Sequence, residues 1–142
     1  MTAISTHRKN ASLAVTEGIR ITASPKLDTE QSDINSKTWV FRYAISIVNE
    51  SQTPVTLLRR RWLIVDASGA RHEVKGDGVI GQTPRLEPGG KFGYESYCPM
   101  KTPWGTMEGF YTFRREPGDE FEAAVARFYL VSESSVVPSL IP

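Results

Sequence analysis

Residues 39–49 read WVFRYAISIVN, and this stretch decides the fold. Bulky apolar side chains occupy its odd-numbered positions from Trp39 to Ile47, whereas Arg42 and Ser46 lie at even-numbered positions. Because successive side chains of a β-strand point to opposite faces, this period of two predicts a strand whose odd-numbered face is buried. The polar residues that follow, NESQTP up to position 54, end the pattern and predict a turn.

Similar stretches lie on both sides of this strand and are separated by turns rich in glycine, proline and aspartate. The clearest of these turns are residues 66–69, 87–90 and 116–119. About seven short strands at intervals of roughly 8–12 residues predict an all-β domain, either a sandwich or a barrel. Trp62 shares its parity with Ile64 and is expected in the core between two sheets. The strands are expected at residues 17–24, 39–48, 55–65, 70–75, 91–97, 108–115 and 120–131.

The last of these elements, residues 120–131, has two interpretations. Phe121 and Val125 share one parity, but Phe128 and Leu130 continue on the other. A β-bulge, which inserts one extra residue into a strand, reconciles the two halves. A helix is the rival, because Phe121, Val125 and Phe128 also fit a spacing of 3.6 residues. The residues of this stretch alone leave both open.

The length and the cysteine content bound the architecture and the compartment. The chain has 142 residues and one cysteine, Cys98. This length fits one domain, expected at residues 15–131 between a flexible N-terminal tail at 1–14 and a C-terminal tail at 132–142. A lone cysteine forms no internal disulfide, and no secretory signal or apolar run of roughly 18 residues is visible. We therefore expect a cytoplasmic protein without a membrane partner.

The charge balance argues against nucleic acid as a partner. The formal net charge is +1, so no overall positive field attracts an anionic polymer. The run Arg59-Arg60-Arg61 alternates between the two faces of a strand and adds a modest local patch. Arginine stems that cover a sheet and keep their charged ends in water are the favoured explanation of this run.

Residues 76–81, GDGVIG, match the G-x-G-x-x-G motif of dinucleotide-binding proteins. That motif binds a pyrophosphate when a helix follows, and here prolines and glycines leave no room for one. One interpretation is a sharp connection that requires glycine conformations. The other is an anion nest of backbone N–H groups for a phosphate-containing small molecule. Its residues are Gly76, Gly78 and Gly81, with the flanking cations Arg71, Lys75 and Arg85.

Residues 98–105, CPMKTPWG, carry two prolines and are therefore expected to form a loop. Methionine and aromatic side chains on a loop are typical of a protein-binding surface. The alternative for Trp104 is that it folds back as a lid on the core. The expected partner-binding residues are Pro99, Met100, Thr102, Pro103 and Trp104.

Neither a catalytic group nor a metal site emerges from the remaining reactive residues. The two histidines, His7 and His72, are far apart, and no cluster has metal-ligand spacing. An acidic loop at residues 28–33 lacks the pattern of a calcium site and is expected to be solvated. His72 beside Cys98 or Ser96 has no local signature of a nucleophile, so we expect Cys98 to be buried and inert. We expect no enzymatic activity, no metal and no cofactor.

An ordered series of motifs resembles the ApaG family. It comprises residues 60–66, 76–89, 92–94, 102–109 and 121–130, and the resemblance covers roughly residues 15–131. It implies an immunoglobulin- or fibronectin type III-like β-sandwich of about seven or eight strands, with a strand at 120–131. Bacterial members carry a link to cobalt and magnesium efflux, and eukaryotic members are fused to F-box modules. Suggestions of pyrophosphate or nucleotide binding also attach to the family's glycine loop.

Together these features predict a non-enzymatic binding domain. A protein-protein interaction module acting through residues 98–105 is the first hypothesis, with an unspecified protein partner. A phosphate, pyrophosphate or nucleotide binder acting through the glycine motif is the alternative. Exposed sheet edges also leave pairing into a homo-oligomer open.

Overall fold

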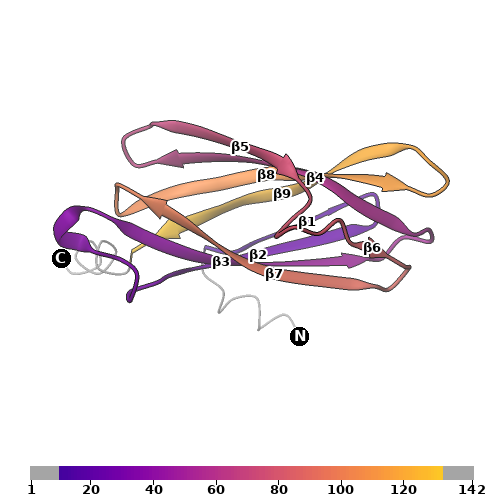
Figure 1. The fold of residues 1–142 in the computed structure, drawn as a ribbon, viewed down its shortest axis with the longest axis horizontal. Helices are drawn as coiled ribbons and strands as arrows, with labels where there is room; N and C mark the ends of the chain where they lie inside the picture. Colours follow the sequence, from indigo (N-terminus) through magenta and orange to yellow (C-terminus); the bar gives the residue numbers. More distant parts are fainter. Residues whose placement is uncertain (1–9, 133–142) are drawn as a thin grey trace.

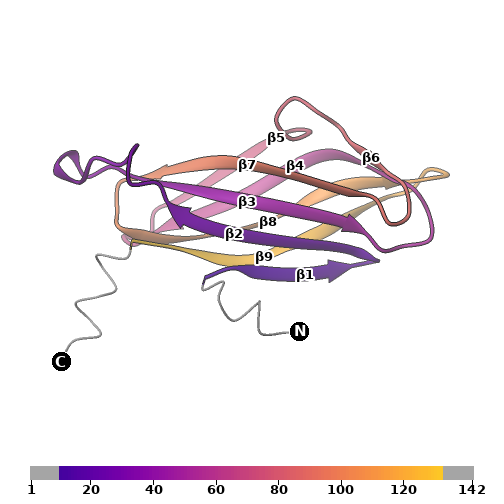
Figure 2. The same ribbon diagram turned by 90° about the horizontal axis from the view of Figure 1, so that it is seen from below.

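The fold is a sandwich of two antiparallel β-sheets. A computed structural model describes residues 10–132, and most of both expected tails lies outside this range. One sheet has the strand order β1-β2-β3-β7 and the other β5-β4-β8-β9, with β6 paired to β4 (Figures 1 and 2). The strands are β1 (Ser12–Thr16), β2 (Ile19–Leu27), β3 (Trp39–Asn49), β4 (Val55–Asp66), β5 (Arg71–Asp77), β6 (Arg85–Leu86), β7 (Lys91–Met100), β8 (Trp104–Arg115) and β9 (Glu120–Val131).

This arrangement confirms the predicted β-sandwich and is consistent with a fibronectin type III-like fold. The described residues form nine strands, against the seven or eight expected. A short 3-10 helix, η1 (Ile34–Ser36), interrupts the connection from β2 to β3. No helix in residues 10–132 is long and apolar enough to cross a membrane.

The core forms where the odd-numbered face of β3 meets the second sheet. Every odd-numbered side chain from Trp39 to Ile47 is buried, as the period of two predicts. Trp62 of β4 lies opposite and packs edge-on against Tyr43, Tyr111 and Phe128, with ring centroids 5.6 to 6.0 Å apart. Edge-to-face contacts of this kind stabilise aromatic pairs beyond the area that they bury. The expectation of a core tryptophan is therefore confirmed.

The last element is the strand with a bulge, and the helix interpretation is wrong. Met107 of β8 pairs with Phe128, whereas Gly109 pairs with Val125, so β9 inserts one extra residue opposite Glu108. The bulge reverses the parity of β9. As a result, Val125 before it and Phe128 after it are both buried.

Strand β1 begins at Ser12, inside the segment expected as an N-terminal tail. It forms a hairpin with β2 through Glu17 and Gly18, which both have positive φ angles. The sequence signal was weak because the outward-facing residues are the apolar ones: Leu13 and Val15 are exposed.

Strand β7 continues to Met100, so the expectation of a loop across residues 98–105 is wrong. Pro99 pairs with Val40 of β3 within the strand, and residues 101–103 alone connect β7 to β8. Proline is tolerated here because β7 is the outermost strand of its sheet, where a missing N–H can face solvent.

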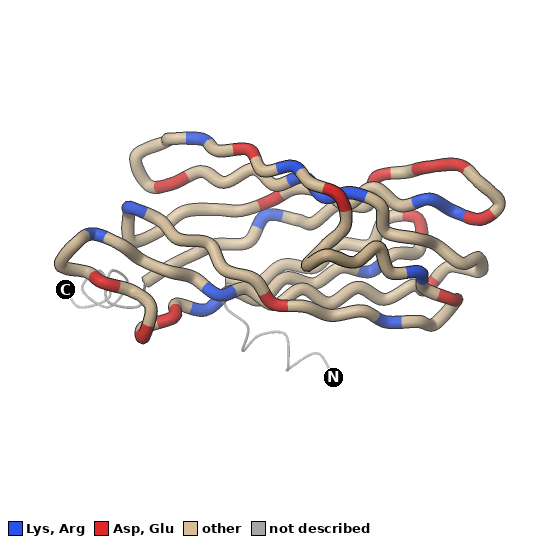
Figure 3. The backbone as a smooth tube through the Cα atoms, viewed as in Figure 1, with Lys and Arg blue, Asp and Glu red and all other residues tan. Residues whose placement is uncertain are grey.

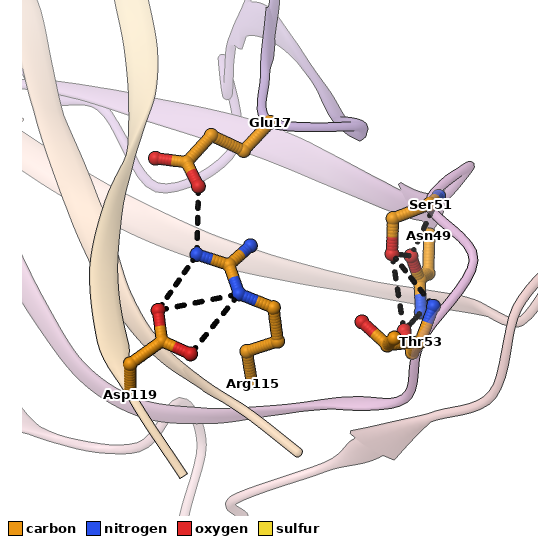
Figure 4. A network of polar contacts seen from close by, with 6 residues as sticks. All are labelled: Glu17, Asn49, Ser51, Thr53, Arg115 and Asp119. Carbon is orange, nitrogen blue, oxygen red and sulfur yellow. Dashed lines mark hydrogen bonds and ion pairs between the residues drawn. The ribbon is translucent and has the colours of Figure 1, made fainter. Parts of the chain in front are cut away.

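Charged residues of both signs are distributed along the whole of the described backbone (Figure 3). At one end of the sandwich, two polar clusters hold the turns in place (Figure 4). Asn49 is fully buried, and its amide donates to the carbonyl oxygens of Thr53 and Leu86 at 2.9 and 3.0 Å. The Arg115 guanidinium donates to Glu17 at 2.7 Å and to Asp119 at 2.9 Å. The contact between Arg115 and Glu17 joins the β1–β2 and β8–β9 hairpins, which belong to different sheets.

Candidate functional site

The glycine motif leaves β5 and leads directly to strand β6, so the expectation that no helix follows it is confirmed. Gly78 and Gly81 have φ angles of +62° and +77°, which favour glycine. A Cβ atom at Gly78 would clash with the carbonyl oxygen of Gln82, whereas one at Gly81 would meet open space. Val79 between them is buried in the core. The motif therefore anchors a tight turn.

Gly76 has a different reason for lacking a side chain. The Arg60 guanidinium crosses it from the neighbouring strand, and a Cβ atom at Gly76 would lie 2.7 Å from Nη1 of Arg60. The same Nη1 donates to the carbonyl oxygens of Asp77 at 3.1 Å and Gly78 at 2.8 Å. Sequence reasoning missed Arg60 as a partner of the glycine motif. The register that pairs Arg60 with Gly76 is a tertiary feature.

Several backbone amides of the motif already have partners. Gly78 N–H donates to the Leu58 carbonyl at 2.7 Å, and Val79 and Gln82 exchange two hydrogen bonds of 2.8 Å. An anion nest needs successive N–H groups that point at the ligand. The structural interpretation thus accounts for all three glycines, and anion binding by the motif stays a prediction.

The three flanking cations occupy different surroundings. Arg71 and Lys75 are exposed on β5, on the face of the sheet that points away from the core. Arg85 instead forms ion pairs with Glu116 and Glu87. Hydrogen bonds to these carboxylates raise the pKa of Arg85 above its ordinary value. Arg85 is therefore already paired, whereas Arg71 and Lys75 make no ion pair with any residue that the structure describes.

The expected partner-binding residues divide between the surface and the core. Pro99 and Trp104 are exposed, and Trp104 keeps 46% of its surface accessible, so it is no lid on the core. Thr102 donates to the Trp104 carbonyl at 2.8 Å, and the half-buried Pro103 accepts from the Ser132 amide. Met100 is only 5% exposed, and its place in a partner-binding surface was wrong. The alternation of β7 continues through Pro99 and turns Met100 inward.

Trp104 belongs to the outer face of the β5-β4-β8-β9 sheet, which sequence reasoning did not identify. Trp104 pairs with Val131, and Thr106 pairs with Tyr129, so Trp104 and Tyr129 are diagonal neighbours on adjacent strands. Tyr129 is 44% exposed. Apolar residues at solvent-facing positions of β4 and β8, such as Phe110, were the available signal.

Two shallow depressions of about 400 and 510 Å³ lie on this outer face and share Arg61 and Phe110 among their lining residues. The Arg61 guanidinium lies 5.8 Å from the centre of the Phe110 ring and pairs with Glu73 at 2.8 Å. Arg59 pairs with Glu120 at 2.8 Å. The outer face therefore carries both aromatic side chains and charged side chains that are paired within the chain.

The remaining reactive groups do not form a joint site. Burial raises the pKa of the Cys98 thiol to about 11, and His72 lies exposed on the opposite sheet. Burial also raises the pKa of Asp28, but hydrogen bonds from Gln31 and the Arg42 charge outweigh this and hold it below its ordinary value. Within residues 10–132 no three His, Cys, Asp or Glu side chains are grouped to hold a metal ion.

Comparison with known proteins confirms the ApaG resemblance. The ApaG domain family matches residues 29–115. Protein ApaG of Anaeromyxobacter dehalogenans strain 2CP-1 is 46% identical over 125 residues, covering 88% of this chain and 98% of that protein. Protein ApaG of Methylobacterium sp. strain 4-46 is 44% identical over 117 residues, covering 82% and 90%. A solved structure of a putative ApaA protein from Bordetella pertussis is similar with a TM-score of 0.80 and 38% identity, covering 84% and 97%. The chain thus belongs to the ApaG domain family.

Proposed function

We propose that this domain is a non-enzymatic protein-interaction module of the cytoplasm. Its interface is the outer face of the β5-β4-β8-β9 sheet around Trp104, rather than a loop at residues 98–105. The main observation behind this proposal is that Trp104 and Tyr129 lie on neighbouring strands of that face. Their side chains are 46% and 44% exposed to solvent. Tryptophan and tyrosine are the residues that most often dominate protein interfaces.

The surroundings of this pair support the proposal. Protein interfaces combine an aromatic centre with a polar border that stays partly hydrated. The ion pair Arg127–Glu108 lies next to these two aromatic side chains, and the ion pair Arg61–Glu73 lies further along the same face. Because these charges are already paired within the chain, a partner that covers the aromatic centre leaves few of them without a counter-charge.

The test compares Trp104→Ala with Tyr97→Ala. Tyr97 is 50% exposed, but it lies on the other sheet, so it is a matched aromatic control. Proteins that bind the wild type and Tyr97→Ala, but not Trp104→Ala, are identified, purified and measured by calorimetry. We expect Trp104→Ala to cost at least about 2 kcal/mol of binding free energy. A purified partner that binds both variants with equal affinity would place the interface elsewhere.

Binding of a phosphate-containing small molecule at the glycine motif is a second proposal. It is supported by Arg71 and Lys75, which approach the motif along β5 without an ion pair in the described part of the chain. The backbone amides of Gly78 and Val79 argue against it, because both already donate hydrogen bonds within the chain. Calorimetric titration with pyrophosphate, for the wild type and Lys75→Ala, decides the matter. The absence of heat at millimolar pyrophosphate would remove this alternative.

A further inference from the structure

Strand β5 forms a free edge of the sandwich. It is the last strand of its sheet and hydrogen-bonds to β4 on one side, while no described strand pairs with its other side. Figure 1 shows this edge along the top of the molecule. Every residue of β5 except Gly76 is exposed. An edge of this kind presents unpaired backbone N–H and C=O groups and can pair with another strand.

The charges along β5 alternate in sign. Basic and acidic positions alternate along its backbone (Figure 3). On the face that points away from the core, the side chains are Arg71, Glu73, Lys75 and Asp77 in this order. The other face carries His72, Val74 and Gly76, and Val74 at the centre of the strand is 39% exposed. A strand that carries only positive charges would repel its own copy, whereas an alternating pattern does not.

We infer that two copies of this chain pair through β5, antiparallel and centred on Val74. In this register Arg71 lies opposite Asp77 of the second copy, and Glu73 lies opposite Lys75 of the second copy. The two-fold symmetry repeats both pairs, so four cross-strand pairs of opposite charge form. Val74 meets its own counterpart on the other face. The β5-β4-β8-β9 sheets of the two copies become one continuous sheet across the two-fold axis.

The charges of this register fit each other without rearranging the fold. Arg71, Lys75 and Asp77 form no ion pair with any residue between 10 and 132, so each is available to a second copy. Glu73 keeps its ion pair with Arg61 and gains a second cation. Opposite charges directly across an antiparallel pair stabilise it, and like charges in that position destabilise it.

The second free edge, β7, lacks this self-complementarity. Pairing centred on Glu95 would place Glu95 against itself and Lys91 against Pro99 of the second copy. Proline has no N–H for the ladder, and the glutamates repel each other. On the opposite side of the sandwich, β1 and β9 lie against each other, and the Tyr129 amide donates to the Asn10 carbonyl. Among these edges, β5 is the one that combines an unpaired backbone with charges that complement a second copy of the strand.

The pairing is expected to be reversible. A strand of seven residues spans roughly 23 Å, and one pair of such strands buries less surface than most permanent dimers. We expect the chain to be monomeric at low micromolar concentration and dimeric towards millimolar concentration. Added salt weakens the dimer because the four charge pairs are exposed. Sedimentation equilibrium from about 10 µM to about 1 mM measures the association.

The first test locates the axis by cross-linking. In the inferred register, the two Val74 Cα atoms lie about 4.5–5.5 Å apart, within the range that a disulfide spans. The two His72 Cα atoms are separated by about 13 Å along the strands. Val74→Cys is therefore expected to form a covalent dimer with oxidised glutathione, which is reduced as the two thiols are oxidised. His72→Cys, an exposed position on the same face, is the control. Equal cross-linking of the two variants would overturn the register.

The second test exchanges charges. Arg71→Asp places two acids opposite each other, and Asp77→Arg places two bases opposite each other, so each variant alone should dimerise roughly tenfold more weakly. An equimolar mixture of the two restores opposite charges in every pair between unlike copies. The double variant Arg71→Asp/Asp77→Arg restores them within one species. Both are expected to regain wild-type association.

Both altered side chains are exposed, and circular dichroism checks that the variants fold. A wild type that stays monomeric at 1 mM (about the highest practical concentration) would overturn the inference, as would a mixture that associates no better than its components. Either outcome leaves the interaction proposal intact, because Trp104 and Tyr129 lie on β8 and β9, away from the β5 edge.

Discussion

The phenolic oxygens of Tyr94 in β7 and Tyr111 in β8 lie 2.5 Å apart, so one hydrogen bond joins the two sheets. Burial raises the pKa of both hydroxyls above the ordinary value. Tyr111 is fully buried, and Tyr94 is partly buried against the core. Each hydroxyl therefore gives the other a hydrogen-bond partner at a position where water has little access.

Removing both hydroxyls of this pair should cost less stability than the sum of the two single removals. Tyr94→Phe leaves the Tyr111 hydroxyl without this partner, and we expect a loss of about 1–3 kcal/mol in the free energy of unfolding. Tyr111→Phe should behave similarly. Because Tyr94→Phe/Tyr111→Phe leaves no polar group stranded, its cost should fall below the sum of the single variants by about 1 kcal/mol. Urea unfolding followed by tryptophan fluorescence measures the cycle, and strict additivity would contradict the coupling.

The three glycines of the motif should differ in their tolerance of alanine. Gly78→Ala combines a positive φ angle with a clash against the Gln82 carbonyl, so it should cost roughly 3 kcal/mol or more. Gly76→Ala displaces the flexible Arg60 guanidinium and should cost about 1–2 kcal/mol. Gly81→Ala carries only backbone strain of about 1 kcal/mol. Thermal unfolding tests this order, and a Gly81→Ala variant as unstable as Gly78→Ala would be inconsistent with it.

Alkaline pH should destabilise the domain from about pH 9 upwards. Burial raises the pKa of Cys98 from 9.0 to about 11, so the folded state keeps its thiol protonated while the unfolded state ionises. The thiol therefore has no effect on stability below pH 9 and lowers stability between about pH 9 and 11. The raised pKa values of Tyr43, Tyr94 and Tyr111 extend the loss above pH 10.

Cys98→Ala separates the two contributions, because the loss in that variant should begin near pH 10 (the ordinary pKa of tyrosine). Urea midpoints measured at intervals from pH 7 to about pH 11 follow the change. Identical profiles for the wild type and Cys98→Ala would show that the thiol does not contribute.

The two tryptophans of the second sheet should lose very different amounts of stability on truncation. Trp62→Ala removes the centre of the aromatic core and should cost about 3–5 kcal/mol. Trp104→Ala removes a half-exposed side chain and should cost about 1 kcal/mol or less. Chemical unfolding of both variants checks this difference. A large loss in Trp104→Ala would mean that this residue serves the fold, and its binding assay would then lose its meaning.

Local patterns predicted most of the strands. Each strand with one buried face repeats its apolar residues every two positions, as between Trp39 and Ile47, so the pattern is visible without knowing any neighbour. Strand β1 escaped because Leu13 and Val15 point to solvent. Strand β7 was ended too early because Pro99 is compatible with a strand only at a sheet edge, and edges are defined by the assembled sheet.

The candidate site was less predictable. Trp104 was identified from its residue type, but its neighbour Tyr129 lies 25 positions further along the chain, and the β8–β9 register brings the two together. Methionine is a residue type that is common at protein interfaces, yet the alternation of β7 turns Met100 into the core.

The sequence by itself determined that this protein is a β-sandwich, because the period of two and the turn residues are local properties of the chain. For residues 120–131 the local pattern left a bulged strand and a helix open, and the β8–β9 register of the tertiary structure decided for the strand. Only the tertiary structure decided that Gly76 makes room for Arg60, that Tyr94 meets Tyr111 and that β5 is left as a free edge. Each of these depends on which strands become neighbours, and that choice is made by packing between segments far apart in the chain.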